Sequence, residues 1–454
     1  MTTCCGALAL GTLLCVAAAA KSSPRTTKQL VSNPRFARKG QGGVPTDWEA
    51  WRPVWAQAAC TMRITPEGLR FTAPGRPYAV GGVLQHLRGV QGGQAYAVDV
   101  SCRVRRIASP QRSAMVRLYW TREGKMLHPA GWLVRGPAVA DGVATFHDVL
   151  VAPKEADGAR LSLEVKWPQG GSVVWTRASV RPAAMPKPRK AKLGAATFIP
   201  RNSTPEKNLE QWCAQIDAAG KLGLDAVCLG EAITLVGTGR SVADVAEPIP
   251  GPSTRRLGEA ARRNKLYVIA GLNERDGDTL YNTAVLIDRK GKLAGTYRKV
   301  HLLREEWRQG IRPGTEYPVF RTDFGTVAIQ ICYDWFFPEA AEAFALHGAE
   351  VLFAPTWGNT LPDDDTGRVH GETTFRVRSR DNGLYIVPCV YSGSSMVVDP
   401  TGRILATSKG RQGPIVWCEV DLATRERFPF TGHWHSIWLR HRMPDTYGPL
   451  TKEK

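Results

Sequence analysis

The chain has 454 residues, of which 43% are hydrophobic, and it carries 60 Lys and Arg against 41 Asp and Glu. This length allows two or three domains, and the apolar content with 14 tryptophans excludes a disordered chain. The positive charge is uneven: residues 1–190 hold 27 Lys and Arg against 10 Asp and Glu, whereas the remainder holds 33 against 31. The basic part indicates either a generally cationic surface that aids solubility or attraction to an acidic partner, namely a polyanionic glycan or an envelope surface. Nucleic acid is not expected, because no nucleic-acid-binding motif is present.

The first 20 residues predict a signal peptide. The run from Ala7 to Ala20 is apolar and made of small residues, and its length suits the hydrophobic region of a signal peptide better than a membrane span. No Lys or Arg precedes this run, which departs from the usual pattern. We nevertheless expect export to the periplasm or the medium. Residues 21–46 are rich in Lys, Arg, Ser, Pro and Gly without apolar periodicity, and they predict a flexible basic arm.

Residues 47–181 predict an all-β accessory domain. Short runs of alternating apolar and polar residues are separated by Gly and Pro, as in Ala95–Val104, Ala114–Trp120 and Leu161–Trp167. This period of two with turn punctuation indicates an antiparallel β-sandwich of jelly-roll type. Such domains often bind carbohydrate through exposed aromatic rings, although most of its tryptophans are expected in the core. The sequence leaves open whether Cys60 and Cys102 pair after export.

Residues 182–191 predict a proline-stiffened linker, and residues 192–450 a second domain of a different class. Strand-like and helix-like segments alternate there: a strand near Ala195–Ile199, a helix at Pro205–Leu222, a strand at Ala226–Leu229 and a helix at Ser253–Asn264. This alternation is typical of an α/β domain whose sheets are covered by helices.

Three reactive side chains each follow a strand-like run of this domain. Glu231 follows the run that ends at Gly230, Lys299 stands in the string Tyr297–Leu302, and Cys332 comes directly after the apolar run that ends at Ile331. A thiol on a tight turn between a strand and a helix projects into a pocket beside backbone N–H groups. A carboxylate, an ammonium and a thiol are the groups needed to cleave an amide.

The chain from residue 192 to 450 resembles the nitrilase, or carbon–nitrogen hydrolase, superfamily. The strings that carry the resemblance occur in the family's order: Asn208–Glu210, Leu280–Asp288, Tyr297–Leu302, Pro313–Gly314, Phe324–Gly325, Ile331–Glu339, Arg378, Asp381–Asn382 and Ser395–Gly402. The resemblance implies an α/β fold, a four-layer αββα sandwich, here preceded by the β-sandwich. It also implies a homodimer and a mechanism that needs no metal or organic cofactor.

The resemblance further assigns roles to residues of this chain. Glu231 would be the general base, Cys332 the nucleophile, and Lys299 would stabilise the thiolate and the oxyanion of the tetrahedral intermediate. A second glutamate after the lysine orients both groups in the family. Glu306 fits that role better than Glu305, but the sequence does not exclude the neighbour. His301 is expected to pack structurally.

The backbone N–H of Tyr333 is the expected second oxyanion donor, and Trp357 is expected to line the substrate pocket. Nitrilases usually continue their cysteine with Trp-Glu, whereas Tyr333-Asp334 follows here, as in the amidase and N-carbamoyl-amine hydrolase branches. We therefore predict a thiol-dependent hydrolase of a linear amide or an N-carbamoyl amine. The alternative is an inactive hydrolase-like protein that binds a surface or glycan through its basic β-sandwich. One departure is Gly230, which stands where the family usually has proline.

Overall fold

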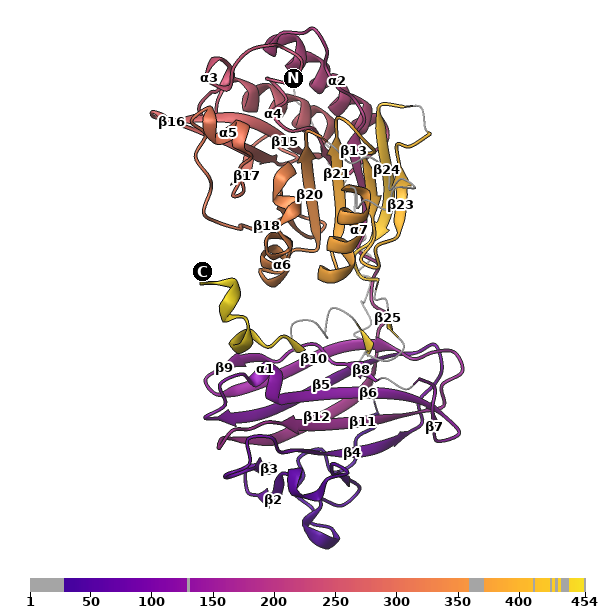
Figure 1. The fold of residues 1–454 in the computed structure, drawn as a ribbon. Coiled ribbons are helices and arrows are strands. Elements are labelled where there is room, and N and C mark those ends of the chain that lie inside the picture. Colours follow the sequence, from indigo (N-terminus) through magenta and orange to yellow (C-terminus); the bar gives the residue numbers. More distant parts are fainter. Residues whose placement is uncertain are drawn as a thin grey trace, which may run out of the picture.

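The structure is a computed structural model that describes residues 28–128, 131–358, 371–410, 413–424, 427–428, 432–433 and 441–452. The chain forms two units, each with its own hydrophobic core (Figure 1). One core draws on residues 31–180 and the other on residues 191–420. Residues 1–20, predicted to be a signal peptide, lie outside the described part. Among the described residues, no helix is long and apolar enough to cross a membrane.

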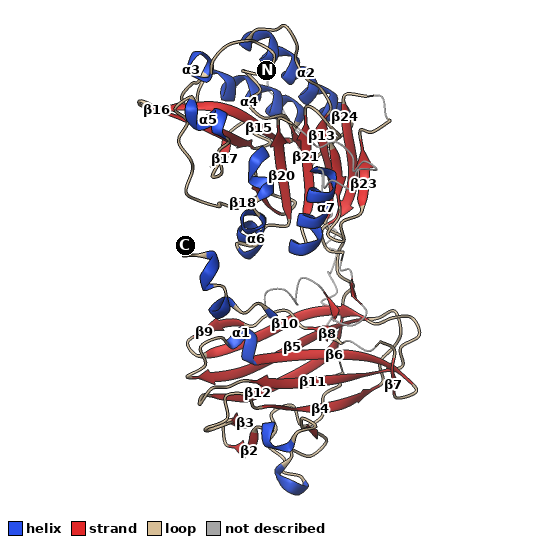
Figure 2. Cartoon of the chain, viewed as in Figure 1, coloured by secondary structure: helices blue, strands red, loops and turns tan. Residues whose placement is uncertain are grey.

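The N-terminal unit consists of two antiparallel sheets (Figure 2). The first has the order β1 (Glu49–Trp51), β4 (Val80–Arg88), β11 (Gly158–Lys166), β6 (Ala114–Arg122) and β7 (Lys125–Met126), with β8 (Trp132–Leu133) also paired to β6. The second has the order β2 (Thr61–Thr65), β3 (Gly68–Thr72), β12 (Ser172–Ala183), β5 (Ala95–Arg105), β10 (Val143–Val151) and β9 (Ala138–Ala140).

Alternate residues of these strands fill one core between the two sheets. Val116 and Leu163 enter it from the first sheet, and Val98 and Trp175 from the second. The two-sheet, all-antiparallel architecture was predicted from the alternation; the jelly-roll connectivity stays a prediction. Cys60 and Cys102 are free thiols, so the pairing left open by the sequence does not occur in this structure.

The expected flexible arm is wrong for residues 28–46, because this segment packs on the sandwich. Phe36 and Val31 belong to the core, and Phe36 lies 5.1 Å from Trp48 between ring centroids. The backbone pairs with β12, since the N–H of Ala178 donates to the carbonyl of Pro34. Isolated apolar residues without periodicity anchor a segment whose overall composition is polar.

Two mixed sheets pack face to face in the C-terminal unit. One has the order β17 (Leu293–Arg298), β16 (Thr279–Ile287), β15 (Tyr267–Asp276), β14 (Ala226–Cys228), β13 (Lys190–Ala196) and β24 (Ile415–Asp421). The other has the order β18 (Phe320–Arg321), β19 (Thr326–Ile329), β20 (Val351–Thr356), β21 (Tyr385–Val390), β22 (Met396–Val398) and β23 (Ile404–Thr407). Three central strands of each sheet are parallel, namely β13–β15 and β19–β21.

Helices cover the outer face of each sheet. Helices α2 (Pro205–Lys221) and α4 (Pro252–Asn264) contact the first sheet, and α6 (Pro338–Leu346) and α7 (Gly371–Asn382) lie on the side of the second. Helix α2 begins where Thr204 accepts a hydrogen bond from the N–H of Lys207 and Pro205 takes the first position. This order of layers confirms the predicted αββα sandwich. The shorter helices are α1 (Pro110–Ser113), α3 (Val242–Val245) and α5 (Arg304–Arg308).

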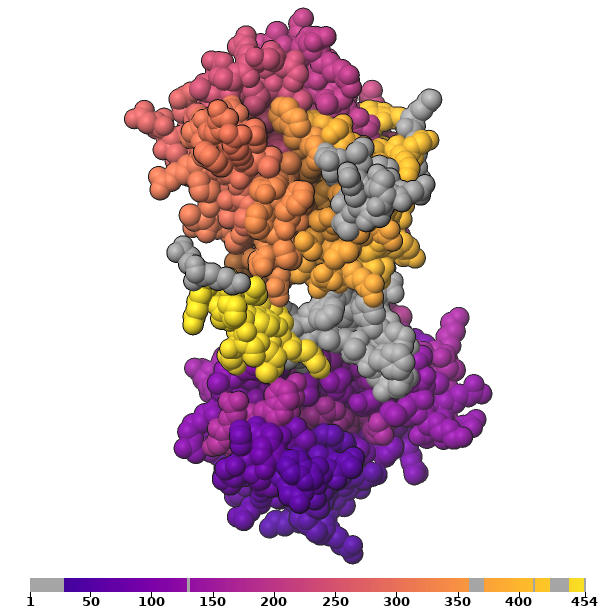
Figure 3. Space-filling view, viewed as in Figure 1, coloured from indigo at the N-terminus to yellow at the C-terminus, as the bar shows by residue number. Residues whose placement is uncertain are grey.

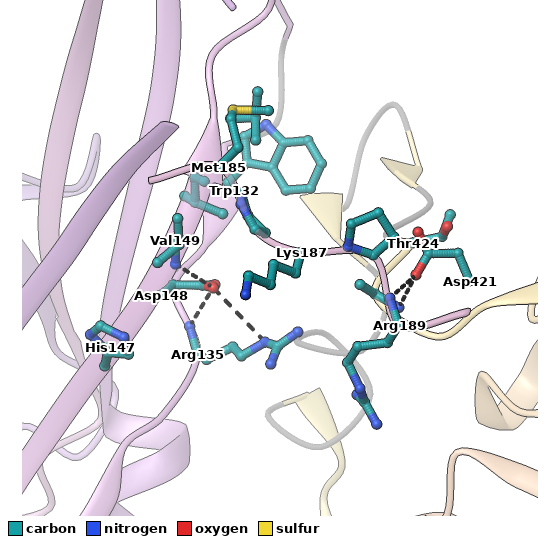
Figure 4. Close-up of a pocket in the computed structure, with 15 residues that line it drawn as sticks. Trp132, Arg135, His147, Asp148, Val149, Met185, Lys187, Arg189, Asp421 and Thr424 are labelled. Carbon is teal, nitrogen blue, oxygen red and sulfur yellow. Dashed lines mark hydrogen bonds and ion pairs between the residues drawn. The ribbon is translucent and has the colours of Figure 1, made fainter. Parts of the chain in front are cut away.

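The two units meet at a junction made by the linker and the C-terminal segment. The predicted linker is shorter than 182–191, because β12 continues to Ala183 and β13 begins at Lys190. The C-terminal segment lies between the units (Figure 3), where Arg442 pairs with Glu342 of α6 and Asp445 with Arg112 of α1. A cavity of about 490 Å³ opens beside the linker, and Figure 4 shows Trp132, Met185 and Lys187 on its wall.

We expect Phe36→Ala to lower the free energy of unfolding by about 3 kcal/mol, because it removes a fully buried ring from the core of the sandwich. Chemical denaturation of the purified protein measures this change. The exposed Gln41, five residues along the same segment, supplies the control: Gln41→Ala should change the stability by less than about 0.5 kcal/mol. Equal effects of the two substitutions would contradict this packing and favour the flexible arm predicted from the sequence.

Candidate active site

The three predicted reactive residues lie at the ends of strands from both sheets of the C-terminal unit. Glu231 follows β14, Lys299 follows β17, and Cys332 follows β19 as the first residue of a short 3-10 turn, η3 (Cys332–Phe336). Strand β14 is parallel to both of its neighbours and β19 is parallel to β20, and functional groups gather at the carboxyl ends of parallel strands. Contact between β14 and β20 brings these ends together across the two sheets.

Lys299 is buried between two carboxylates. Its side chain is 1% exposed, and its Nζ donates to Glu231 Oε1 at 3.0 Å and to Glu306 Oε2 at 2.8 Å. Burial alone would lower the pKa of this ammonium, but the negative charges around it, Glu231 first among them, raise the pKa above its usual value. Lys299 therefore stays protonated.

Glu306, not Glu305, is the second glutamate of this cluster. It stands in the first turn of α5, where its Oε2 also accepts the N–H of Leu303. Within the described part of the chain, Lys299 pairs with Glu231 and Glu306 but not with Glu305. The choice that the sequence left open is thereby resolved in favour of the residue whose side chain reaches the lysine.

Asn282 links the two carboxylates and was missed by the sequence analysis. Its Nδ2 donates to Glu231 Oε1 at 2.8 Å and to Glu306 Oε1 at 2.7 Å, while its backbone carbonyl accepts the N–H of Lys299. The residue is buried on β16. The sequence shows Asn282 in the string before the lysine, but it does not show that its side chain bonds to Glu231 and Glu306.

Cys332 adopts a backbone conformation that few side chains tolerate. Its φ of 42° lies in the left-handed region, which projects the thiol away from the strand. Burial raises the pKa of this thiol to about 12. Glu231 also raises the pKa, whereas Lys299 and the backbone N–H groups of Trp357 and Gly358 lower it. The Cys332 thiol is therefore neutral at rest and needs a base to become a nucleophile.

Trp357, which was expected to line the substrate pocket, contacts Glu231. Its backbone N–H donates to Glu231 Oε2 at 2.8 Å. Its ring is 41% exposed and meets the ring of Tyr391 edge-on, with 5.7 Å between centroids. Tyr333 is half-buried, and its ring packs on Phe336 and Phe337.

A buried carboxylate, Asp334, ties the lysine segment to the cysteine turn. Its oxygens accept hydrogen bonds from Tyr297 Oη at 2.7 Å, from the N–H of His301 at 3.0 Å and from the N–H of Ile331 at 3.1 Å. His301 Nδ1 also lies 2.8 Å from Asp334. Tyr297 and His301 each stand two residues from Lys299, so one side chain holds both sides of that segment against the turn of Cys332.

His301 takes the structural place that was expected of it. Its ring stacks on Phe337 with centroids 3.8 Å apart, and its Nδ1 faces Asp334.

The ring of Tyr391 explains the glycine at position 230. A Cβ on Gly230 would collide with this ring, whose hydroxyl donates to the backbone carbonyl of Glu231. A tyrosine on the second sheet thus occupies the space that a proline would need.

Among the described residues, no group of three His, Cys, Asp or Glu side chains is arranged to hold a metal ion.

Comparison with known proteins decides the family. The family model described as carbon-nitrogen hydrolase matches residues 191–430, which is more than half of the chain. The chain belongs to the carbon–nitrogen hydrolase family. The resemblance inferred from the motifs is therefore confirmed.

This carbon–nitrogen hydrolase aligns with most of the length of several relatives. It is 32% identical to the omega-amidase of Mus musculus over 240 residues, which is 49% of this chain and 85% of that protein. It is 31% identical to a nitrilase of Pyrococcus abyssi over 248 residues, 51% of this chain and 90% of that protein. Among solved structures, Nit3 of Saccharomyces cerevisiae aligns with a TM-score of 0.46 and 28% identity, covering 51% of this chain and 90% of that one.

In this carbon–nitrogen hydrolase, the charges beside Cys332 predict opposite effects of two substitutions on the reactivity of its thiol. Glu231 raises the pKa of Cys332 and Lys299 lowers it, so Glu231→Gln should lower that pKa and Lys299→Gln should raise it. Each unit of decrease raises the thiolate fraction at pH 8 about tenfold. Iodoacetamide labelling of the Cys332 peptide across pH, followed by mass spectrometry, should be faster in Glu231→Gln and slower in Lys299→Gln than in wild type. The opposite order would contradict the arrangement.

We expect Asp334→Asn to lower kcat for any substrate of this hydrolase about 10²-fold, because it loosens the placement of Lys299 against Cys332. The asparagine keeps the size of the side chain but offers an N–H group where an oxygen accepts donors. Tyr297→Phe removes one of these hydrogen bonds and should cost less. Steady-state kinetics separates the effect on kcat from that on KM; wild-type kcat in Asp334→Asn would refute the role.

Proposed function

We propose that the protein hydrolyses a non-peptide carbon–nitrogen bond, in a linear amide or an N-carbamoyl amine, through a thioester on Cys332. The observation that carries this proposal is the buried cluster of Glu231, Lys299 and Glu306, of which Glu231 and Lys299 act by their charges on the Cys332 thiol. It is an enzyme of the amidase type with a glutamate, a lysine and a cysteine in catalysis.

In the first half of the reaction, Cys332 attacks the carbonyl carbon as its proton passes to Glu231. The raised pKa of the thiol makes a free thiolate scarce at neutral pH, so proton transfer accompanies the attack. Glu231 can accept this proton. Its two carboxylate oxygens offer about four acceptor sites, and three hydrogen-bond donors occupy three of them.

The oxygen of the tetrahedral intermediate would be stabilised by the ammonium of Lys299 and the backbone N–H of Tyr333. Glu231 then returns its proton to the nitrogen, the carbon–nitrogen bond breaks, and ammonia or an amine leaves. The acyl group remains on the sulfur of Cys332 as a thioester.

In the second half, water loses a proton to Glu231 and attacks the thioester. The carbon–sulfur bond breaks, the sulfur regains a proton from Glu231, and the acid departs. Glu306 and Asn282 would keep Lys299 and Glu231 oriented through both halves. Trp357 would bound the substrate through its partly exposed ring.

An amide is favoured over a nitrile as substrate. Tyr333-Asp334 after the cysteine resembles amidase branches, and several relatives bear the name omega-amidase. An amide substrate agrees with both observations, although one relative is named a nitrilase. Export and a homodimeric state stay predictions from the apolar run Ala7–Ala20 and from the family resemblance.

The test is release of ammonia from a panel of linear amides, N-carbamoyl amines and nitriles. We expect turnover of an amide or carbamoyl amine and its loss, by at least about 10³-fold, in Cys332→Ala, because the nucleophile is gone. Glu306→Gln should retain folding and lose activity about 10²-fold, since Lys299 loses one of its two carboxylates.

Two controls make the outcome decisive. Glu305→Gln, one residue away and not paired with Lys299, should retain near-wild-type activity. Turnover of nitriles alone would replace the amidase assignment. Turnover that survives in Cys332→Ala would reject the thioester, and silence of the folded wild type over the whole panel would favour the binding-protein alternative.

A further inference from the structure

One outer face of the N-terminal unit gathers arginines from four neighbouring strands. In the sheet that contains β2, β3, β12 and β5, Arg63 is paired with Arg70, Arg70 with Val174, and Val174 with Arg103. Adjacent residues on these strands enter the core, so this row points outward. Neighbouring strands lie about 4.8 Å apart, which places three guanidinium groups within a span of roughly 15 Å.

Other arginines extend this row along the strands. Arg105 stands two residues from Arg103 on β5, and the β-bulge between Trp175 and Arg177 turns Arg177 to the same face. Val174 is fully buried although it faces outward, which agrees with coverage by the aliphatic parts of Arg70 and Arg103. We call this set the arginine face: Arg63, Arg70, Arg103, Arg105, Arg177 and Arg181.

Carboxylates neutralise only part of the arginine face. Glu67 pairs with Arg70 and Arg105, and Asp99 pairs with Arg181. Within the described part of the chain, three of its four exposed members, Arg63, Arg103 and Arg177, have no carboxylate partner.

Two surface hollows flank the face, and basic side chains line both. One, of about 370 Å³, is bounded by Arg70, Arg105 and Arg106 together with the backbone of Gly170 and Gly171. The other, of about 660 Å³, is bounded by Arg35, Lys39 and Arg177, with Glu67 as its carboxylate. Basic side chains therefore line the arginine face and both of the hollows beside it.

We propose that the arginine face binds a linear acidic polysaccharide. Guanidinium groups bind carboxylate and sulfate in a bidentate manner, and repeated anionic groups along a polymer match arginines repeated across strands. Hydroxyls for hydrogen bonds to sugar stand among the arginines, on Thr61, Thr72 and Ser172.

The composition of the face argues against nucleic acid. Single-stranded nucleic acid is held by basic side chains combined with aromatic rings that stack on bases. The outward residues of β2, β3, β12 and β5 include no aromatic side chain. Recognition of a base sequence in double-stranded DNA usually requires a helix or β-ribbon that enters a groove. A flat sheet face supplies no such element.

The face also leaves the catalytic unit free. Strands β2 and β3 lie on the side of the sandwich remote from the C-terminal unit (Figure 1). Binding there is independent of the hydrolase chemistry, so either proposal can fail without the other.

Isothermal titration of the purified full chain with heparin, polygalacturonate and neutral dextran at 100 mM NaCl tests the proposal. We expect one or both acidic polymers to bind and dextran not to bind; heparin alone would indicate sulfate, and polygalacturonate alone carboxylate. Replacing Arg63, Arg103 and Arg177 together by Gln should weaken binding at least tenfold. The slope of log Kd against log salt should fall by roughly one for each arginine removed from the polymer's charged groups.

A charge-matched triple variant controls for net charge. Arg240, Arg255 and Arg262 are exposed on the C-terminal unit, and their replacement by Gln should change affinity less than twofold. Equal weakening in the two triple variants would overturn the proposal, as would absence of binding to both acidic polymers. Tighter binding of polyuridylate or of anionic lipid vesicles than of either polysaccharide would also reject the proposed occupant. Thermal melting verifies that each variant folds.

Discussion

The buried ammonium of Lys299 is the constraint on which the catalytic unit depends. Taking an ammonium out of water costs several kcal/mol unless opposite charges and hydrogen bonds meet it. Here Glu231 and Glu306 meet it from positions 68 and 7 residues away along the chain. The charge is tolerated only when the loop after β14, the end of β17 and helix α5 are all in place. The contacts that make this burial tolerable also fix the position of Glu231, the proposed base, so stability and the proposed chemistry depend on the same atoms.

The seam between the two sheets supplies the second half of the geometry. Glu231 and Lys299 belong to one sheet, whereas Cys332 and Trp357 follow strands of the other. Several hydrogen bonds cross the seam, among them those from the N–H of Trp357 to Glu231, from Tyr297 to Asp334 and from the Tyr391 hydroxyl to the carbonyl of Glu231. Because close-packed cores resist small displacements, the face-to-face packing of the sheets sets the spacing of thiol, base and ammonium.

The sequence sufficed where information is local and failed where it depends on distant pairing. Strand-end strings predicted Glu231, Lys299 and Cys332, and the alternation of strands and helices predicted the layers. The choice between Glu305 and Glu306 needed the start of α5, since both lie in one helical turn. Asn282 and Asp334 act through partners many residues away, and nothing in the local pattern identifies those partners. Phe36 lies in a polar segment without periodicity, so its burial could not be predicted. The arginine face depends on strand register and on a bulge, which alternation alone does not specify.

The excess positive charge of the chain lies on the β-sandwich and not at the Lys299 cluster. The ammonium of Lys299 is already matched by two carboxylates within 3.0 Å. Strand β10 borders the junction with the catalytic unit, and Arg63 on β2 is four strand positions from it, roughly 19 Å away. That separation is about twice the Debye length of 8–10 Å at physiological salt, so Arg63 influences the buried cluster little. A change of charge at Arg63 can therefore alter the surface of the sandwich without changing the pKa of the Cys332 thiol.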